Sequence, residues 1–273
     1  MKFFKTLVST ALTSAVIFGL STPISAATES YNIDEYFPDP ALNKFVRQYD
    51  TDRNGSFDRN ELKNAGDEYS GALRYLWIRD PEIKSLDGME LFSDMYLLHL
   101  SDLSMSKIDL TAIPIKIVEI SDCANLKTLV CGKKQETLNI SKCSLDRTYF
   151  NYADNLNSMT IYKTTLKRDL DLENSPKMQY FYFLESKGKG VYFSDEAELK
   201  KASVCGWNTT LRSFSSIGTK LNTVQTLCIS TNGTLNSLTL NAELVKFIVE
   251  HNYYYFNNNG TVNGSDDILI QVD

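Results

Sequence analysis

Pairs of apolar residues two positions apart recur along most of the chain at nearly constant spacing. The pairs are Leu76/Ile78, Leu98/Leu100, Val118/Ile120, Leu138/Ile140, Met159/Ile161, Phe181/Phe183, Ala202/Val204, Leu227/Ile229 and Phe247/Val249. Their second members advance by 22, 20, 20, 21, 22, 21, 25 and 20 residues. Because residues i and i+2 point to the same face of a strand, each pair predicts one short strand with an apolar face.

The predicted strands lie at 73–78, 95–100, 115–120, 136–140, 158–162, 179–184, 201–205, 226–230 and 246–250. A second set of apolar residues falls about ten positions after most pairs: Leu86, Ile108/Leu110, Leu129, Phe150, Leu170/Leu172, Phe193, Phe214 and Leu238/Leu240. A single short strand cannot bury its apolar face, so such repeats must stack and cover one another. Two apolar sides per repeat predict a flattened solenoid. A β-sandwich would explain strands at about 8–12-residue spacing, but not the constant full period.

A loop ahead of the first repeat carries oxygen ligands at the spacing of an EF-hand. Its first, third, fifth, seventh, ninth and twelfth positions are Asp50, Asp52, Asn54, Ser56 (through its carbonyl), Asp58 and Glu61, and Gly55 stands at the turn. A simple surface turn would not require a glutamate at the last position. This loop therefore predicts a Ca²⁺ site, and calcium suits it better than magnesium, which takes fewer protein ligands.

Helical patterns flank the loop. Before it, Leu42, Phe45, Val46 and Tyr49 share one helical face behind Pro40, and a short helix starting at Glu61 follows it. A solenoid end needs a cap with a polar outer side. Since this helix–loop–helix directly precedes the first repeat, we expect it to be that cap, with Ca²⁺ in a structural role.

The two ends of the chain differ from the repeats. Residues 1–27 read as a secretory signal peptide, with Lys2 and Lys5 before an apolar run at 7–20 and small residues at 25–27. We therefore divide the chain into a signal peptide (1–27), a cap (28–70) and a solenoid (71–273). An Asn/Gly-rich loop is expected at 252–267, before a closing strand at 268–272.

Charge and composition narrow the function. The formal net charge is −6, and removal of Lys2 and Lys5 makes it about −8, which argues against nucleic acid as a partner. No segment after the signal peptide is apolar over a bilayer-spanning length, so we expect a secreted or surface-associated protein. The five cysteines form no CxxC pair, which argues against structural zinc.

The early repeats resemble a known family. “LRYLWI…SLDGMELFSDMYLLHLSDLSMSKIDL” and “ANLKTLVC…ETLNISKC” resemble the leucine-rich repeats of secreted and surface proteins of Gram-positive and gut bacteria. Those proteins often begin with a helix of pattern F-P-D-x-x-F-x-x-Y-V and one EF-hand loop, and this chain has Phe37-Pro38-Asp39, Phe45-Val46 and Tyr49. The likeness covers about residue 34 onward, and it loosens where Phe, Tyr and Val replace Leu.

This resemblance implies a β-rich, horseshoe-like leucine-rich repeat solenoid of strands and short turns, with a concave sheet. It also implies a small polar residue at the bend after each strand, where Cys123 and Cys143 stand. These cysteines are therefore expected to be buried thiols, with a Cys123–Cys143 or Cys205–Cys228 disulfide as the alternative.

Residues that alternate with the apolar pairs should face outward. Two aromatic-rich groups stand out: Tyr75, Trp77, Arg79 and His99 in the first coils, and Tyr162, Tyr180 and Tyr182 further on. Exposed aromatics with an arginine are common anchors of protein interfaces, although aromatic residues also simply favour strands. We expect an adhesin-like module that binds an unidentified protein on a host or neighbouring cell. The alternatives are a carbohydrate- or cell-wall-binding module and a structural spacer.

No catalytic constellation is recognisable. The only histidines, His99 and His251, fall some seven coils apart, so they cannot share a site in a solenoid. No phosphate-binding loop, nucleophile elbow or HExxH pattern is present. We therefore expect no enzymatic activity.

Overall fold

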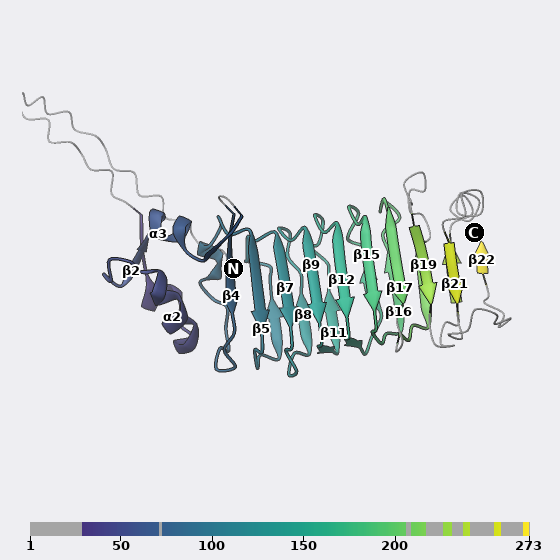
Figure 1. Ribbon diagram of the computed structural model, residues 1–273, viewed down its shortest axis with the longest axis horizontal. Coiled ribbons are helices and arrows are strands. Elements are labelled where there is room, and N and C mark those ends of the chain that lie inside the picture. Colours follow the sequence, from purple (N-terminus) through teal and green to yellow (C-terminus); the bar gives the residue numbers. More distant parts are fainter. Residues whose placement is uncertain are drawn as a thin grey trace, which may run out of the picture.

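The protein is an elongated β-solenoid of about seven coils with short helices at its N-terminal end (Figure 1). The computed structural model describes residues 29–70, 73–205 and 209–216, together with the strands β19 (Thr226–Ser230), β20 (Ser237–Leu240), β21 (Tyr254–Asn257) and β22 (Ile270–Val272). The expected signal peptide at 1–27 and the expected strand at 246–250 lie outside the described residues.

The N-terminal region consists of β1 (Ser30–Asn32), α1 (Ile33–Tyr36), α2 (Pro40–Val46), the 3₁₀ turn η1 (Arg47–Tyr49), β2 (Ser56–Asp58) and α3 (Arg59–Asn64). Each α-helix begins at a side-chain cap: Asn32 for α1, Asp39 for α2 and Asp58 for α3. The helix–loop–helix expected from the sequence is present. Its second helix begins two residues earlier than expected, because Asp58 forms a capping box with Glu61.

The main sheet contains β3 (Asp67–Ser70) and nine parallel strands. The latter are β4 (Leu73–Ile78), β5 (Leu97–Ser101), β7 (Ile117–Ser121), β9 (Thr137–Ser141), β12 (Ser158–Tyr162), β15 (Tyr180–Leu184), β17 (Lys201–Cys205), β19 and β21. Neighbouring strands pair in an unbroken register in which each predicted apolar pair lies beside the next, from Leu76/Ile78 to Leu227/Ile229. The periodicity therefore predicted the first eight strands and their order correctly.

The last parallel strand lies where we expected a loop. Strand β21 pairs with β19 and aligns Tyr254 with Leu227 and Phe256 with Ile229, so the prediction of a loop throughout 252–267 was wrong at 254–257. Tyr254 and Phe256 are two residues apart, as are the two members of each predicted apolar pair. The Asn and Gly residues near this pair led us to expect a loop instead of a strand. The expected strand at the C-terminus is present as β22, which pairs with β20.

A second layer of strands lies opposite the main sheet from the coil of β5 onward. It contains β6 (Lys107–Asp109), β8 (Thr128–Val130) and β11 (Arg147–Tyr149) in one sheet, and β14 (Leu170–Leu172), β16 (Gly190–Phe193), β18 (Ser213–Ser216), β20 and β22 in another. The first coil carries the 3₁₀ turn η2 (Met89–Leu91) between β4 and β5. Apart from Leu86, which lies before η2, the second apolar set of the sequence lies on these strands or next to them in the chain. All its members are buried wherever their side chains are described. A two-strand ladder of β10 (Ser144–Leu145) with β13 (Thr165–Leu166) forms from the segments that follow β9 and β12 in the chain.

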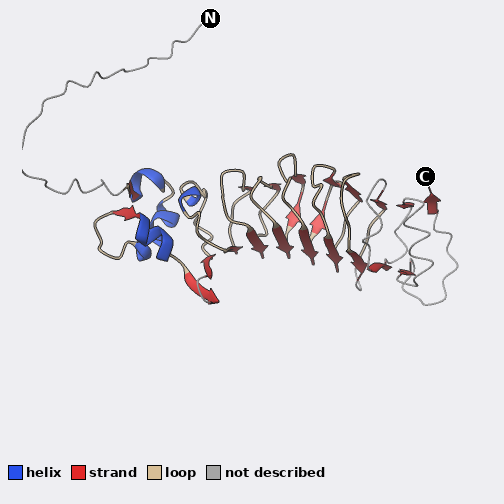
Figure 2. Ribbon diagram, turned by 90° about the horizontal axis from the view of Figure 1, so that it is seen from above, coloured by secondary structure: helices blue, strands red, loops and turns tan. Residues whose placement is uncertain are grey.

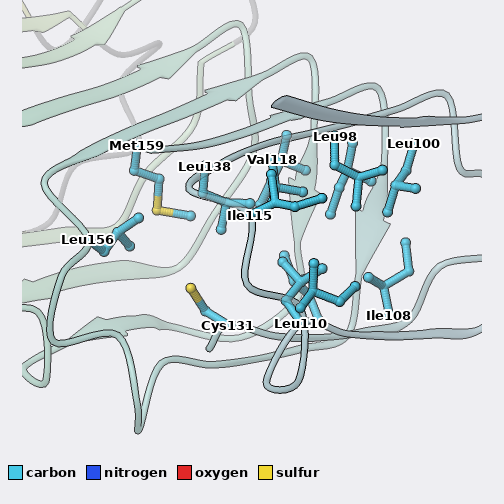
Figure 3. Close-up of a cluster of buried hydrophobic side chains, with 14 of the residues drawn as sticks. Leu98, Leu100, Ile108, Leu110, Ile115, Val118, Cys131, Leu138, Leu156 and Met159 are labelled. Carbon is cyan, nitrogen blue, oxygen red and sulfur yellow. The ribbon is translucent and has the colours of Figure 1, made fainter. Parts of the chain in front are cut away.

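The two layers enclose one continuous apolar core (Figure 3). Figure 3 shows Leu98, Val118 and Leu138 of the main sheet above Ile108 and Leu110 of the second layer. Burying one such side chain stabilises the fold by about 1.5–3 kcal/mol. In later coils phenylalanine replaces leucine, and the rings of Phe193 and Phe181 meet edge to face with centroids 5.1 Å apart.

The stack of coils runs nearly straight (Figures 1 and 2). The horseshoe curve and the concave sheet implied by the resemblance are not visible in the described coils. From the coil of β5 onward both sides of a coil carry strands, so neighbouring coils are separated by the same interstrand distance, about 4.7–4.9 Å, on both sides. Equal spacing on the two sides gives a straight stack, whereas a different spacing on the opposite side would curve the sheet.

Five successive coils, from β5 to β15, leave the main sheet through the same sharp bend. The residue after the strand is left-handed in five successive coils: Asp102, Asp122, Lys142, Lys163 and Glu185 have φ between 48° and 55°. The next residue points inward and is buried: Leu103, Cys123, Cys143, Thr164 and Ser186. The left-handed conformation of a non-glycine residue costs about 1–2 kcal/mol. In return, the chain turns inward at this point.

Polar side chains at these bends bind the backbone. The Thr164 hydroxyl donates to the carbonyl of Tyr162 (3.0 Å) and accepts the N–H of Cys143 (3.2 Å). Ser186 repeats both bonds one coil later, with Leu184 (2.8 Å) and Thr164 (3.0 Å). Cys123 and Cys143 occupy equivalent positions as free, buried thiols, as the sequence predicted.

Candidate metal centre and outward face of the main sheet

Three carboxylates converge in the N-terminal loop. Asp50, Asp52 and Glu61 each offer one oxygen, and these oxygens lie within 4.8 Å of one another. Asp50 follows η1, Asp52 lies in the loop, and Glu61 stands in the first turn of α3. Asp50 and Glu61 are buried whereas Asp52 is exposed. Since like charges so close repel one another, the cluster could hold a metal ion.

The loop backbone orients the first two of these carboxylates. The two oxygens of Asp50 accept the N–H groups of Asn54 (3.1 Å) and Gly55 (2.9 Å). Asp52 also accepts the N–H of Asn54 (3.0 Å). Gly55 has a φ of +82°, the left-handed conformation in which a side chain would be strained. The tight turn thus brings the carboxylates of Asp50 and Asp52 close together.

Glu61 closes the loop from the other side. Its Oε1 accepts the backbone N–H (2.7 Å) and the hydroxyl (2.8 Å) of Thr51, and its Oε2 accepts the N–H of Asp58 (3.1 Å). Burial acts to raise the pKa of Glu61, but these donors stabilise the charged form and the pKa falls below its usual value. The glutamate is therefore anionic near neutral pH, as a cation ligand must be.

The other expected ligands lie around this cluster in different roles. The amide of Asn54 donates to Asp52 (2.7 Å), and its oxygen accepts the N–H of Ser56 (2.8 Å). Ser56 begins β2, and the Asp58 carboxylate caps α3 by accepting the N–H of Glu61 (2.8 Å). Sequence reasoning missed Thr51, because EF-hand spacing assigns no ligand to the second position of the loop.

The loop is joined firmly to its surroundings. Strand β2 pairs antiparallel with β1, and Gly55 accepts the N–H of Ile33 (3.0 Å). The Phe57 ring is fully buried, with its centroid 5.9 Å from those of Phe37 and Phe92. Because Phe92 belongs to the first coil, the loop shares a core with the solenoid.

Asp39 links α2 to the first coil. One carboxylate oxygen caps the helix by accepting the N–H groups of Ala41 (3.0 Å) and Leu42 (2.9 Å). The other accepts those of Lys84 (2.7 Å) and Ser85 (3.1 Å). No sequence signal predicted the second pair of bonds, since Asp39 before Pro40 indicates only a helix start.

The first predicted binding group does come together on the outward face of the main sheet. Tyr75, Trp77 and His99 line one depression of about 450 Å³, and Trp77 and Arg79 line a neighbouring one of about 550 Å³. Trp77 is 51% exposed. Its indole N–H donates to the hydroxyl of Ser101 (2.9 Å), and its ring lies 5.3 Å from that of His99. Arg79 pairs with Asp102 at 2.6 Å.

The second predicted group lies three to five strands further along and contains no exposed residue comparable to Trp77. Tyr162, Tyr180 and Tyr182 are each partly buried. A lysine ammonium stands over two of these rings, Lys163 at 4.9 Å from Tyr162 and Lys201 at 5.5 Å from Tyr182. The structure therefore places the two groups on different coils of the same sheet.

Fold and site together define a β-solenoid with an N-terminal region of short helices and an acidic cluster that could hold a metal ion. No family model matches the chain, and a search of curated proteins found no match. Among the described helices, none is long and apolar enough to cross a membrane.

Proposed function

We propose that this chain is an exported leucine-rich repeat protein that binds another protein through the outward face of its main sheet. The observation that carries this proposal is Trp77, a large aromatic side chain that is half exposed yet fixed by its bond to Ser101. A rigid exposed tryptophan loses little conformational freedom on binding and is a frequent hot spot of protein interfaces.

The bends support the assignment to leucine-rich repeats. Such repeats place a small polar residue after the strand to bind backbone groups, and Thr164, Ser186 and the two buried thiols do this here. The period of 20 to 22 residues in most coils fits the same class. Strands on the second side, where many repeats carry helices, give this solenoid its straight form.

We further propose that the acidic loop binds Ca²⁺ and that the ion stabilises the N-terminal region as the cap of the solenoid. Support comes from the carboxylates of Asp50, Asp52 and Glu61, which converge from both ends of the loop. An ion bound there would offset their mutual repulsion and hold α3 to η1. Calcium prefers such a set of several hard oxygen ligands in a flexible loop.

Glycan binding is the competing proposal for the second group of tyrosines. The lysines above Tyr162 and Tyr182 occupy ring faces on which a sugar would stack. This observation argues against sugar stacking on the second group.

The test is capture of a partner from extracellular or surface material, in the presence of calcium, by the mature chain, that is, residues 28–273 without the expected signal peptide. Trp77→Ala should lose the partner, whereas Tyr152→Ala should retain it. Tyr152 is a matched control because it is also 51% exposed and follows β11 on the second layer. Equal capture by both variants and the wild type would contradict the proposal. Binding to a glycan array without any protein partner would favour the competing one.

A further inference from the structure

We propose that the depression beside Trp77 binds a cationic side chain, an arginine or a lysine, from an extended basic segment of the partner protein. This inference rests on the proposed function, because it specifies the chemistry that the same face recognises. It follows from the lining of the depression, the orientation of its rings and its charge.

The lining combines aromatic rings with carboxylates. The depression, of about 450 Å³, is lined by Glu68, Tyr75, Trp77, Leu97, His99 and Glu119. None of these residues is a lysine or an arginine. A guanidinium or ammonium group is the ligand that gains from both components, through cation–π attraction to the rings and charge-assisted hydrogen bonds to the carboxylates.

The aromatic part is held in place before any ligand arrives. The Trp77 N–H is fixed by Ser101, and the imidazole of His99 is bound at both nitrogens, to Glu119 (3.0 Å) and Ser121 (3.2 Å). The side chains of Trp77, His99 and Glu119 stand in register on adjacent strands. A ligand would therefore meet a preformed surface, which lowers the entropic cost of binding.

Glu119 supplies a carboxylate fixed in orientation. Its Oε2 contacts His99, and its Oε1 accepts the amide of Asn139 at 3.2 Å. Each carboxylate oxygen can accept a second hydrogen bond, so a ligand donor can join without displacing either neighbour. The bond to His99 is the largest cause that lowers the pKa of Glu119 and keeps it anionic.

The nearby arginines do not line this depression. Arg79 pairs with Asp102 at 2.6 Å, and Nη1 of Arg74 donates to the carbonyls of Asn64 (2.7 Å) and Gly66 (2.9 Å). Glu68 on β3 is exposed at the rim. The acidic chain, with a net charge of −6, would also attract a basic segment and repel phosphate-rich ligands.

Defined peptides test this inference directly. The probes are Gly/Ser heptapeptides that carry three arginines, three glutamines or three glutamates, titrated calorimetrically into the mature chain with calcium. The arginine peptide should bind, more weakly as salt is added, and the other two should not. Trp77→Ala should weaken binding about twofold to fivefold, the range expected for an exposed cation–π contact.

Variants that neutralise single carboxylates measure the contribution of the acidic residues separately from that of the aromatic rings. Glu68→Gln and Glu119→Gln should each weaken the arginine peptide, whereas Glu173→Gln, beyond β14 on the second layer, should not. Glu68 is exposed, so its variant tests the charge without disturbing the bonds that Glu119 makes. Equal affinity for arginine and glutamine peptides, absence of binding, or equal loss in Glu173→Gln would overturn the inference.

The outcome also distinguishes this inference from the proposed function. If Trp77→Ala abolishes capture of a protein partner but the peptides show no preference for arginine, the cationic site is wrong and protein binding through this face stands. If capture of the partner does not depend on Trp77, the proposed function itself is wrong.

Discussion

The carboxylate of Asp39 accepts a 2.7 Å hydrogen bond from the backbone N–H of Lys84, 45 residues further along the chain. The same side chain caps α2. It is 7% exposed, so water cannot readily replace these bonds. One aspartate therefore joins the start of a helix to the first coil of the solenoid.

Replacing Asp39 by alanine should destabilise the protein by about 2–4 kcal/mol. The loss combines a helix cap, about 1 kcal/mol, with two hydrogen bonds to the partly buried backbone N–H groups of Lys84 and Ser85, at about 0.5–1.5 kcal/mol each. Urea unfolding curves measure it. Asn32→Ala is the matched control, because Asn32 caps α1 through Asp34 and Glu35 without reaching the solenoid. It should cost only about 1 kcal/mol. Equal losses for the two variants would mean that the link to Lys84 and Ser85 contributes nothing.

The stabilisation from Asp39 should depend on pH in a defined direction. Burial alone would raise the pKa of Asp39, but the N–H groups of Leu42, Lys84, Ser85 and Ala41 outweigh it and lower the pKa below 3.8. A carboxyl with a lower pKa in the folded state stabilises fully above its unfolded value, and this contribution is lost as the pH falls through the folded value. The stability difference between the wild type and Asp39→Asn should therefore be constant above about pH 5 and should narrow below 3.8. A difference that stays unchanged down to about pH 2.5 would contradict this account.

Calcium should stabilise the wild-type protein, and a chelator should remove the effect. At a calcium concentration one hundred times its Kd, mass action predicts about 2.7 kcal/mol. Asp52→Asn should abolish most of this gain at little structural cost, because Asp52 is the exposed member of the cluster. Glu35→Gln, at an exposed position of α1 outside the loop, should respond like the wild type. Identical melting midpoints with calcium and with chelator would exclude a stabilising ion.

Thr164→Val should cost about 1–3 kcal/mol although it preserves the shape of the side chain. The substitution removes the hydroxyl that accepts the N–H of Cys143 and leaves that group unpaired in a buried bend. Thr160→Val, on the outward face of β12, should change the free energy of unfolding by less than about 0.5 kcal/mol. Chemical denaturation of the two variants gives the comparison. Comparable losses at both positions would show that the ladder of bend hydrogen bonds adds no stability.

The solenoid could be predicted because its determinants are local and repeated. Leu76/Ile78 and the seven pairs that follow appear in the structure in the predicted order, since alternation within a strand and constant spacing between strands leave one way to stack. The pattern was overlooked at Tyr254 and Phe256, where Asn and Gly on both sides suggested a loop. The prediction of a curved solenoid rested only on the resemblance to leucine-rich repeats. Curvature depends on which secondary structure forms the second side of the coils, and the repeat pattern did not specify it.

The candidate metal site was also readable, since six ligand positions and one glycine lie within twelve residues. The spacing brought Asp50, Asp52 and Glu61 together, but it could not reveal that Thr51 would orient Glu61. The bonds from Asp39 to Lys84 and Ser85 could not be predicted from the sequence, for a different reason. Contacts between residues 45 positions apart depend on how the N-terminal region packs, and no local pattern encodes that packing.

The unbroken register has a consequence for how such a chain can change its size. Every coil from β5 to β17 presents the same two apolar columns, to the coil before it and to the coil after it. Excision or duplication of one complete turn would bring matching surfaces together again and would shift everything downstream by about 4.8 Å. Loss of a few residues would instead misalign both columns at once. The length of the solenoid can therefore change only by whole coils.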